Sequence, residues 1–464
     1  MDLEGPFTSY DDVFTWLSRF INLERGQTGK SFRLDRMEYL AKKAGHPEGS
    51  FPLIHVAGSK GKGSVTTMIA GILTAGGYRT GRYVSPHVTE YRERLALGSG
   101  FFDPPVYVKA GEELRSLVNQ LTSEARLPGP SMAALFDGRR ALGEEPTFFE
   151  LLTLYFFLCA REAGCTAAAV ETGMGGRLDA TNIVDPVVSV IMPIELEHTE
   201  YLGSTLQAIA GEKAGIIKNQ RPVVVAEQEP EALEVFKNVV LQRNGSLRYL
   251  PQEVRLDQIR VDREGTSARL RYTDHSILPH PLDLRLKLVG EIQAYNAAVA
   301  ILAAKLGFPE LREEDILRGL EEVQLPGRFE KIQDDPPLII DGAHTPRSVT
   351  LCRETFTELY GSQGILLFGC AIDKDSLAMA RILVPHFSTI IITAPGTFKK
   401  SDPPSVYRHF ISVESEKHPK ILLEPDTQGA IELCVNLGME KGAPILVTGS
   451  FYLASAVRRY GEKR

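Results

Sequence analysis

The stretch that decides the fold runs from Pro52 to Ser64 and reads Pro-Leu-Ile-His-Val-Ala-Gly-Ser-Lys-Gly-Lys-Gly-Ser. Its first half, Pro52–Ala57, is an apolar run of the length of a buried strand. Its second half, Gly58–Ser64, is rich in glycine and lysine, and apolar side chains then recur at helical spacing up to the glycine pair at 76–77. A strand, a glycine-rich loop and a helix in this order, with a second strand expected at 82–85, predict a parallel α/β sheet.

The glycine-rich loop predicts a phosphate site. Glycine lets the backbone approach an anion closely, and the N–H groups at the start of the following helix point toward it. Lys62 is placed to reach the β- and γ-phosphates of a nucleotide, and Ser64 to contact magnesium. The Walker spacing is not met, because Val56 and Gly63 stand where that pattern has Gly and Ser or Thr. A flexible loop without a ligand is the alternative, which the flanking strand and helix disfavour.

The rest of the chain predicts two α/β units with a small antiparallel section between them. The first ~50 residues and residues 148–163 have helical patterns, and 127–146 is a loop-rich insertion with repeated Gly and Pro. Between Ser246 and Gly290 leucines alternate with charged residues, which indicates antiparallel sheet with one wet face, and helix returns at 293–306. Further strands are predicted at 167–170, 187–191, 223–226, 338–340, 365–368, 390–393, 421–423 and 445–448.

We therefore predict an α/β fold with two domains and a boundary near residue 325. Residues 1–325 would form a P-loop ATPase domain on a parallel sheet, with the antiparallel section attached. Residues 326–464 would form a Rossmann-like α/β domain without a phosphate loop of its own.

Composition excludes several classes of protein. The 52 basic and 59 acidic residues give a formal charge of −7, which argues against a general nucleic-acid-binding protein. The longest apolar stretch, Leu151–Ala160, is shorter than the roughly 20 residues of a membrane span, and the acidic N-terminus does not resemble a signal peptide. Five scattered cysteines without a Cys-x-x-Cys pair are neither a disulfide framework nor a zinc site. These observations predict a reduced, cytoplasmic protein.

The chain is similar to the folylpolyglutamate synthases and dihydrofolate synthases, which are ATP-dependent amide ligases related to the Mur ligases of cell-wall synthesis. The resemblance rests on motifs that keep the family's order from residue 10 to residue 458. These motifs are His55–Ser64, Ser85–His87 with Glu93–Arg94, Phe148–Glu150, Glu171–Asn182, His198–Gly203, Glu212–Lys218, Gln293 with Asn296, Pro326–Arg328, Asp341–His344, Asp373–Asp375 and Val447–Ser450. Each motif alone is weakly specific, but the ordered set is strongly specific.

The resemblance implies a two-step reaction. ATP phosphorylates a carboxylate of a pterin-containing substrate, and the amine of L-glutamate then attacks the acyl phosphate. A carboxylate is a poor electrophile, and joining it to ATP brings two anions together, which requires metal ions and cationic side chains. The implied substrates are ATP, L-glutamate and a folate or dihydropteroate, and the sequence leaves open which pterin is used. We expect a monomer without nucleic-acid or membrane partners.

The same resemblance implies magnesium at the carboxyl ends of the strands of the first domain. Glu171 follows an apolar strand, where open α/β sheets bind ligands, and Ser64, Ser85 and His198 would complete the ligands of two ions. From chemistry alone, His198 is equally a capping or substrate residue. Lys213 resembles a lysine that carries a carbamate, the alternative being a plain helical lysine paired with Glu212. A monovalent cation is a further candidate.

Nucleotide contacts are implied from both domains. Arg328 and Asp341 resemble residues that reach the nucleotide across the cleft. Gln293 and Asn296 resemble residues on a helix beside the nucleotide; the alternative is that they are a buried polar pair that stabilises this helix. His344 resembles a residue that contacts the incoming glutamate. The nucleotide-binding set is thus Gly58, Ser59, Lys60, Gly61, Lys62, Gly63, Ser64, Gln293, Asn296, Arg328 and Asp341, and the catalytic set is Lys62, Lys213 and His344.

Substrate-side residues and departures from the family pattern leave alternatives. The Ser85–His87 loop resembles the border of the pterin pocket, whereas Glu93 and Arg94 are alternatively a solvated charge pair. Ser59-Lys60 replaces a usual Thr-Asn, and Thr345 replaces a usual Asn. Competing hypotheses are therefore a Mur-type ligase acting on a cell-wall nucleotide and a non-catalytic nucleotide-binding homologue.

Overall fold

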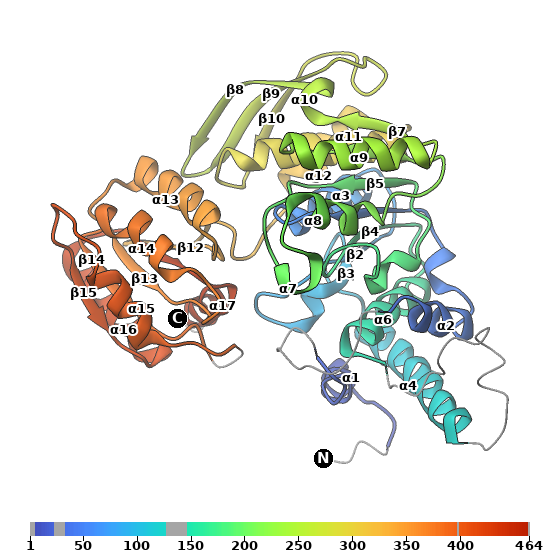
Figure 1. The fold of residues 1–464 in the computed structure, drawn as a ribbon, viewed down its shortest axis with the longest axis horizontal. Coiled ribbons are helices and arrows are strands. Elements are labelled where there is room, and N and C mark those ends of the chain that lie inside the picture. The colour runs from blue at the N-terminus through green and yellow to red at the C-terminus, as the bar shows by residue number, and fades with distance from the viewer. Residues whose placement is uncertain (1–4, 23–32, 127–145, 397–398, 463–464) are drawn as a thin grey trace.

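The computed structural model describes residues 5–22, 33–126, 146–396 and 399–462. Two α/β units lie side by side, each built on its own sheet, and a small three-stranded sheet lies at one end of the N-terminal unit (Figure 1). The predicted fold class is confirmed. The predicted insertion at 127–146 lies outside the described residues except for Pro146.

A seven-stranded sheet forms the centre of the N-terminal unit. Its order is β3-β2-β4-β1-β5-β6-β7, and every pair is parallel except β2 with β3. The strands are β1 (Leu53–Ala57), β2 (Thr80–Tyr83), β3 (Leu95–Leu97), β4 (Ala167–Glu171), β5 (Val188–Ile191), β6 (Pro222–Val225) and β7 (Ser246–Tyr249). The antiparallel expectation for 246–290 is wrong at its start, because Ser246–Tyr249 pairs parallel with β6. This edge strand is only partly buried, so its mixed sequence does not resemble a buried parallel strand.

Helices cover both faces of this sheet because successive strand residues point to opposite sides. Ile54 and Val56 pack with one helix layer, whereas Leu53 and Ala57 face the other. The first layer contains α3 (Lys62–Ala75), α11 (Ile292–Gly307) and α12 (Glu313–Glu321). The second contains α1 (Tyr10–Leu17), α2 (Asp35–Lys43), α4 (Pro104–Arg126), α6 (Phe148–Glu162), α8 (Leu206–Ala214) and α9 (Pro230–Gln242).

The three-stranded sheet is antiparallel, as predicted. It consists of β8 (Val254–Asp262), β9 (Gly265–Tyr272) and β10 (Leu282–Leu286), which follow the short α10 (Leu250–Glu253). Leu282, Leu284 and Leu286 are buried in the core that also contains α11, while Asp283 and Arg285 are exposed.

A six-stranded sheet of order β11-β12-β16-β13-β14-β15 forms the C-terminal unit. Its strands are β11 (Glu330–Asp334), β12 (Pro337–Ile340), β13 (Ile365–Phe368), β14 (Thr389–Ile392), β15 (Lys420–Leu423) and β16 (Ile445–Thr448). Helices α13 (Pro346–Tyr360), α14 (Ser376–Leu383) and α15 (Pro403–Ile411) cover one face, and α16 (Thr427–Lys441) and α17 (Phe451–Gly461) cover the other. The five predicted strands are confirmed, and the polar edge strand β11 was not predicted.

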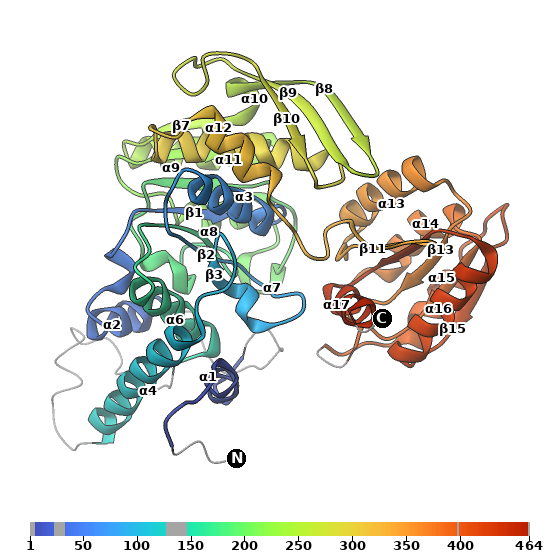
Figure 2. The same ribbon diagram turned by 180° about the vertical axis from the view of Figure 1, so that it is seen from behind.

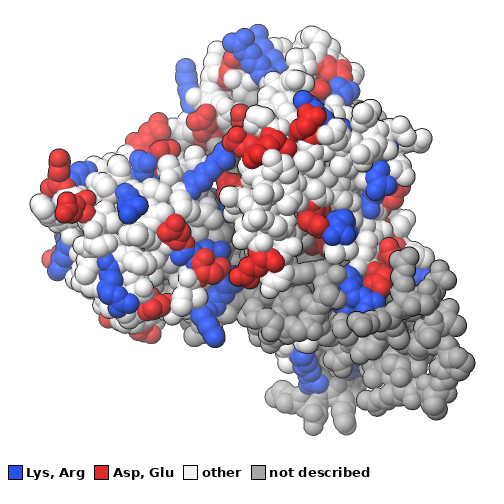
Figure 3. All heavy atoms as spheres, viewed as in Figure 1, with Lys and Arg blue, Asp and Glu red and all other residues white. Residues whose placement is uncertain are grey.

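The two units touch at several points. The β8–β9 hairpin approaches α13 in both ribbon views (Figures 1 and 2). Arg263 on this hairpin donates to the carbonyl of Leu359 on α13 at 2.9 Å. Arg347 at the start of α13 lies 3.6 Å from Glu195 of the N-terminal unit. On the face drawn in Figure 3, acidic and basic side chains are interspersed rather than gathered by sign. In the described part of the chain, no helix combines the length and apolar character that crossing a bilayer requires.

Candidate active site

The predicted site residues of the N-terminal unit gather where four neighbouring strands end. Residues 58–61 follow β1, Ser85 follows β2, Glu171 is the last residue of β4, and residues 193–198 follow β5. These strands are adjacent in the order β2-β4-β1-β5, so the sheet unites segments that are far apart in the sequence. Ligands of open α/β sheets bind at this edge.

The glycine-rich loop is fixed against the segment after β5. The amides of Ser59 and Lys60 donate to the carbonyl of Pro193 at 2.9 and 3.4 Å, and Ser59 Oγ accepts from the amide of Glu195 at 3.0 Å. Gly61 has a φ of +83°, which glycine adopts readily, and α3 begins at the next residue. The first amides of α3 have no partner within the helix and can therefore bind an anion.

Gly63 gives a steric reason for the departure from Walker spacing. A Cβ atom at this position would lie 3.2 Å from Glu171 Oε2. A serine or threonine there would crowd the carboxylate that ends β4, whereas glycine lets α3 pass close to it. The next residue, Ser64, carries the first hydroxyl after Lys62 and is buried, and its predicted role as a magnesium ligand stays a prediction.

Glu171 is a buried carboxylate at the centre of the site. It is 3% exposed, accepts from the amide of Ser85 at 2.9 Å, and lies 4.0 Å from Lys62 Nζ. Burial raises the pKa of Glu171 to about 7, although Lys62 and Arg328 act in the opposite direction. Its ionised form therefore needs positive charge, which a divalent cation would supply.

Lys213 is a second buried group, and it pairs across the site. Its Nζ donates to the carbonyl of Gly58 at 2.8 Å and lies 3.2 Å from Glu197 Oε1. The alternative pairing with Glu212 is wrong, because Glu212 instead pairs with Arg177. Burial and the neighbouring Lys62 lower the pKa of Lys213 to about 8.

His198 and Glu197 lie at the rim of this pocket. His198 is exposed, with a left-handed φ of +48°, and precedes the short α7 (Thr199–Leu202). Its side chain makes no capping hydrogen bond to α7, so the structure does not support the alternative that His198 is a helix-capping residue. Burial opposes ionisation of Glu197, but Lys62, Lys213 and Lys60 lower its pKa to about 2. Glu197 was not among the predicted site residues, although an acid directly before the predicted metal-binding histidine was a usable signal.

The C-terminal unit places charged groups against the same pocket. The electrostatic influence of Arg328 reaches Glu171, and its guanidinium lies 4.4 Å from the ring centroid of Phe451. Asp341 lies just after β12, accepts from the amides of Phe329 and Ala343 at 2.8 and 2.7 Å, and thereby braces the segment that carries Arg328. These contacts do not test whether Asp341 binds a nucleotide, so that role stays a prediction.

His344 faces the N-terminal unit in a neutral form. Its Nδ1 donates to the carbonyl of Gly342 at 2.8 Å, which leaves Nε2 as an acceptor. Burial and the charge of Lys60 lower the pKa of His344 to about 3. The two units thus approach each other at Lys60 and His344.

The remaining predicted residues have bracing contacts. Asn296 Nδ2 donates to Gln293 Oε1 at 3.0 Å, as expected for a pair that stabilises the helix. Asn296 Oδ1 also lies close to the phosphate loop, because a Cβ atom added to Gly61 would be 3.0 Å from it. The solvated-pair alternative for Glu93 and Arg94 is wrong, since Glu93 accepts from backbone amides and Arg94 is buried beside His87.

The departures from the family pattern are accommodated. The charge of Lys60 is balanced by Glu197 and Glu195, which oppose the lowering of the Lys60 pKa by burial. Thr345 is the N-cap of α13, where its hydroxyl accepts from the amide of Ser348. Neither substitution disrupts the local structure.

Comparison with known proteins places the chain among the Mur ligases. The family model "Mur ligase middle domain" matches residues 116–304, and "Mur ligase, glutamate ligase domain" matches 327–451. The chain is 30% identical to the dihydrofolate synthase/folylpolyglutamate synthase of Bacillus subtilis over 98% of its length and 99% of that protein. It is 32% identical to the folylpolyglutamate synthase of Lacticaseibacillus casei over 91% of its length and 93% of that protein.

Solved structures agree. Mycobacterium tuberculosis folylpolyglutamate synthase complexed with ADP and AMPPCP superposes with a TM-score of 0.84 at 27% identity, covering 97% of this chain and 98% of that one. The fold and its site thus define a ligase of the Mur superfamily that uses ATP. Within that class, the chain belongs to the folylpolyglutamate synthase/dihydrofolate synthase family.

Proposed function

We propose that this protein joins L-glutamate to the carboxylate of a folate, with ATP converted to ADP and phosphate. The observation that carries the proposal is the meeting of cationic groups from both units around Glu171. Lys62 lies 4.0 Å from that carboxylate, and the electrostatic influence of Arg328 reaches it from the C-terminal unit. A reaction that unites ATP with a carboxylate needs such positive surfaces on both sides. A solved relative, an FPGS-AMPPCP-folate complex, has a TM-score of 0.80 to this chain.

The chain's own residues divide the work between two domains that we place on either side of residue 325. Lys62 and the first amides of α3 would hold the nucleotide phosphates, with Arg328 and Asp341 on the opposite side and Gln293 and Asn296 beside the loop. The neutral His344 would accept a hydrogen bond at Nε2 from the amine of glutamate. Its pKa of about 3 makes it a weak base, so we assign it orientation of the amine rather than removal of a proton.

Magnesium fits the donor set. We propose that Glu171, Ser64, Ser85 and His198 hold two ions, because the buried carboxylate requires a cation and Mg²⁺ takes few protein ligands when phosphate and water supply the rest. Bound magnesium would neutralise phosphate charge. A carbamate on Lys213 and a monovalent cation are further parts of this proposal.

The test is phosphate release that depends on glutamate. Purified protein is given MgATP and L-glutamate with dihydropteroate or with tetrahydrofolate, in parallel. Release with either pterin, together with a product one glutamate heavier, supports the proposal, and the two arms decide which pterin is used. Release only with a cell-wall nucleotide would favour the Mur-type alternative, and no release with any acceptor would favour the non-catalytic one.

A further inference from the structure

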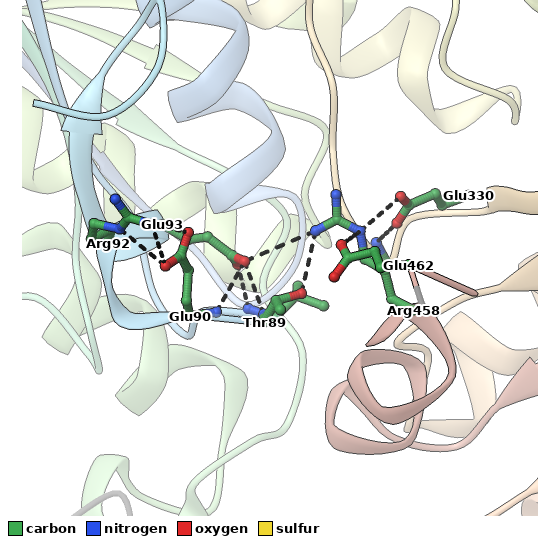
Figure 4. A network of polar contacts seen from close by, with 9 residues as sticks. Thr89, Glu90, Arg92, Glu93, Glu330, Arg458 and Glu462 are labelled. Atoms are coloured by element: carbon green, nitrogen blue, oxygen red, sulfur yellow. Dashed lines mark hydrogen bonds and ion pairs between the residues drawn. The ribbon is translucent and has the colours of Figure 1, made fainter. Parts of the chain in front are cut away.

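Arg458 on α17 reaches from the C-terminal unit to the N-terminal unit (Figure 4). Its Nη1 donates to Thr89 Oγ1 at 3.3 Å and lies 4.0 Å from Glu93 Oε1. Its Nε lies 3.1 Å from Glu330 Oε1 on β11. The side chain is only 25% exposed, so these contacts are partly shielded from water and salt.

On the N-terminal side, Arg458 acts on a turn that leads to Glu171. The carboxylate of Glu93 accepts from the amides of Val88, Thr89 and Glu90 at 2.6, 2.9 and 3.1 Å. It therefore holds the turn that continues from the Ser85–His87 loop. The amide of Ser85 in turn donates to Glu171.

On the C-terminal side, Arg458 acts on the segment that carries Arg328. Glu330 Oε2 accepts from the amide of Gly327 at 2.7 Å, and Gly327 is the residue before Arg328. The same guanidinium thus connects, through the carboxylates of Glu93 and Glu330, the segment whose Ser85 amide donates to Glu171 and the segment that carries Arg328.

We propose that Arg458 is a positioning residue, which fixes the distance between Arg328 and Glu171 by joining the 85–93 turn to the 327–330 segment. The inference rests on the proposed function, in which both groups face the nucleotide. Arginine suits this position because its planar guanidinium offers separate donors to two partners at once. Lysine has a single charged atom on a flexible stem, so we expect it to serve one carboxylate at a time.

The test compares Arg458→Met, Arg458→Lys and the control Arg459→Met, a change at an exposed arginine of the same helix. Methionine keeps an unbranched apolar stem, so α17 should stay packed. We expect Arg458→Met to lower kcat about tenfold, because Arg328 is then misplaced relative to Glu171. The KM for ATP should change less than kcat, because the phosphate loop still binds the nucleotide. Arg458→Lys should recover part of the loss, and Arg459→Met should behave as wild type, all three with wild-type melting temperatures.

A double-mutant cycle identifies the partner. If Arg458 acts through Glu93, adding Glu93→Gln to Arg458→Met should lower kcat less than the product of the two single effects. Multiplicative effects, or kcat and every KM of Arg458→Met within about twofold of wild type, would overturn the proposal.

Hydrogen exchange separates this inference from the proposed function, since it needs no activity. Exchange at the amides of Val88, Thr89 and Glu90 should be faster in Arg458→Met than in wild type and unchanged in Arg459→Met. Unchanged exchange in Arg458→Met would overturn the proposal that Arg458 holds the 85–93 turn, even if the protein is an active ligase. A wild-type protein without glutamate-dependent phosphate release would instead refute the proposed function.

Discussion

Replacing Lys213 by methionine should change how the stability of the protein depends on pH. Burial and Lys62 lower the pKa of this amine from 10.5 to about 8 in the folded state, and its side chain is 1% exposed. The unfolded chain therefore holds the proton more tightly than the folded one. Its ionisation destabilises the fold fully below pH 8, and this penalty disappears as the pH rises from 8 to 10.5.

The magnitude follows from the two pKa values. At about 1.4 kcal/mol for each pH unit between 10.5 and 8, the whole effect is about 3.5 kcal/mol, of which about 2 kcal/mol falls between pH 7 and pH 9.5. Lys213→Met lacks this titration but keeps an unbranched apolar stem. The free energy of unfolding of wild type minus that of the variant should therefore rise by about 2 kcal/mol over this interval.

Urea unfolding at each pH, in EDTA and carbon-dioxide-depleted buffer without nucleotide, measures this difference. Groups that titrate in both proteins cancel from it. Lys109→Met is the matched control, because Lys109 is 72% exposed, and its own difference should be flat with pH. A flat or falling difference for Lys213→Met would refute the claim that this lysine is buried at an energetic cost.

The same pKa has a chemical consequence. At pH 7, roughly a tenth of Lys213 would be neutral, against roughly one part in 3000 for an ordinary lysine. The neutral amine is the form that reacts with carbon dioxide, so we expect Lys213→Ala to be nearly inactive and partly rescued by acetate. Removal of bicarbonate should slow wild type. A bare amine at Lys213 in a crystal of the active complex with nucleotide and magnesium would exclude the carbamate.

Three further predictions concern other parts of the structure. Lys62→Ala and Ser64→Ala should abolish phosphate release with unchanged melting temperature, and near-normal turnover of either at saturating ATP would contradict the phosphate-loop assignment. Glu171→Gln should raise the magnesium concentration needed for half-maximal activity at least tenfold. In wild type, protonation of Glu171 below pH 7 should raise this concentration too. A magnesium requirement that does not change between pH 5.5 and pH 8 would count against a ligand role for Glu171. Thr345→Ala should lower the free energy of unfolding in urea titrations by about 1 kcal/mol, because α13 loses its N-cap, and Thr345→Ser should be close to wild type. Equal stability of wild type and both variants would show that the cap does not contribute to stability.

The central strands of both sheets could be predicted because most of them are continuous apolar runs buried on both faces. Leu53–Ala57 and Ile445–Thr448 are examples in which every residue is buried. Edge strands lack that pattern. Glu330–Asp334 is polar and half-exposed, and Ser246–Tyr249 looks like the antiparallel segment that follows it, so the first was missed and the second was assigned to the wrong sheet.

The candidate site could be located but not resolved into contacts. Glycine and charged residues directly after apolar strands mark the binding edge of a parallel sheet, which places Gly58, Ser85 and Glu171 together. The partner of each group depends instead on side-chain geometry across elements distant in sequence. Lys213, for example, pairs with Glu197 and the carbonyl of Gly58 rather than with the adjacent Glu212.

Incompletely paired charges in the pocket indicate a ligand-binding site rather than a structural core. Buried charges in a core are usually paired, because an unpaired one is costly. The charged groups here are the cations Lys60, Lys62, Lys213, Arg328 and Lys374 and the carboxylates Glu171, Asp179, Glu195, Glu197 and Asp341. Lys62 comes no closer than 4.0 Å to Glu171, and burial still raises the pKa of Glu171 to about 7 and lowers that of Lys213 to about 8. A charged ligand would relieve the cost of both groups. A carbamate on Lys213 would reverse the sign of one of these charges, which would admit magnesium to a pocket whose lysines otherwise repel it.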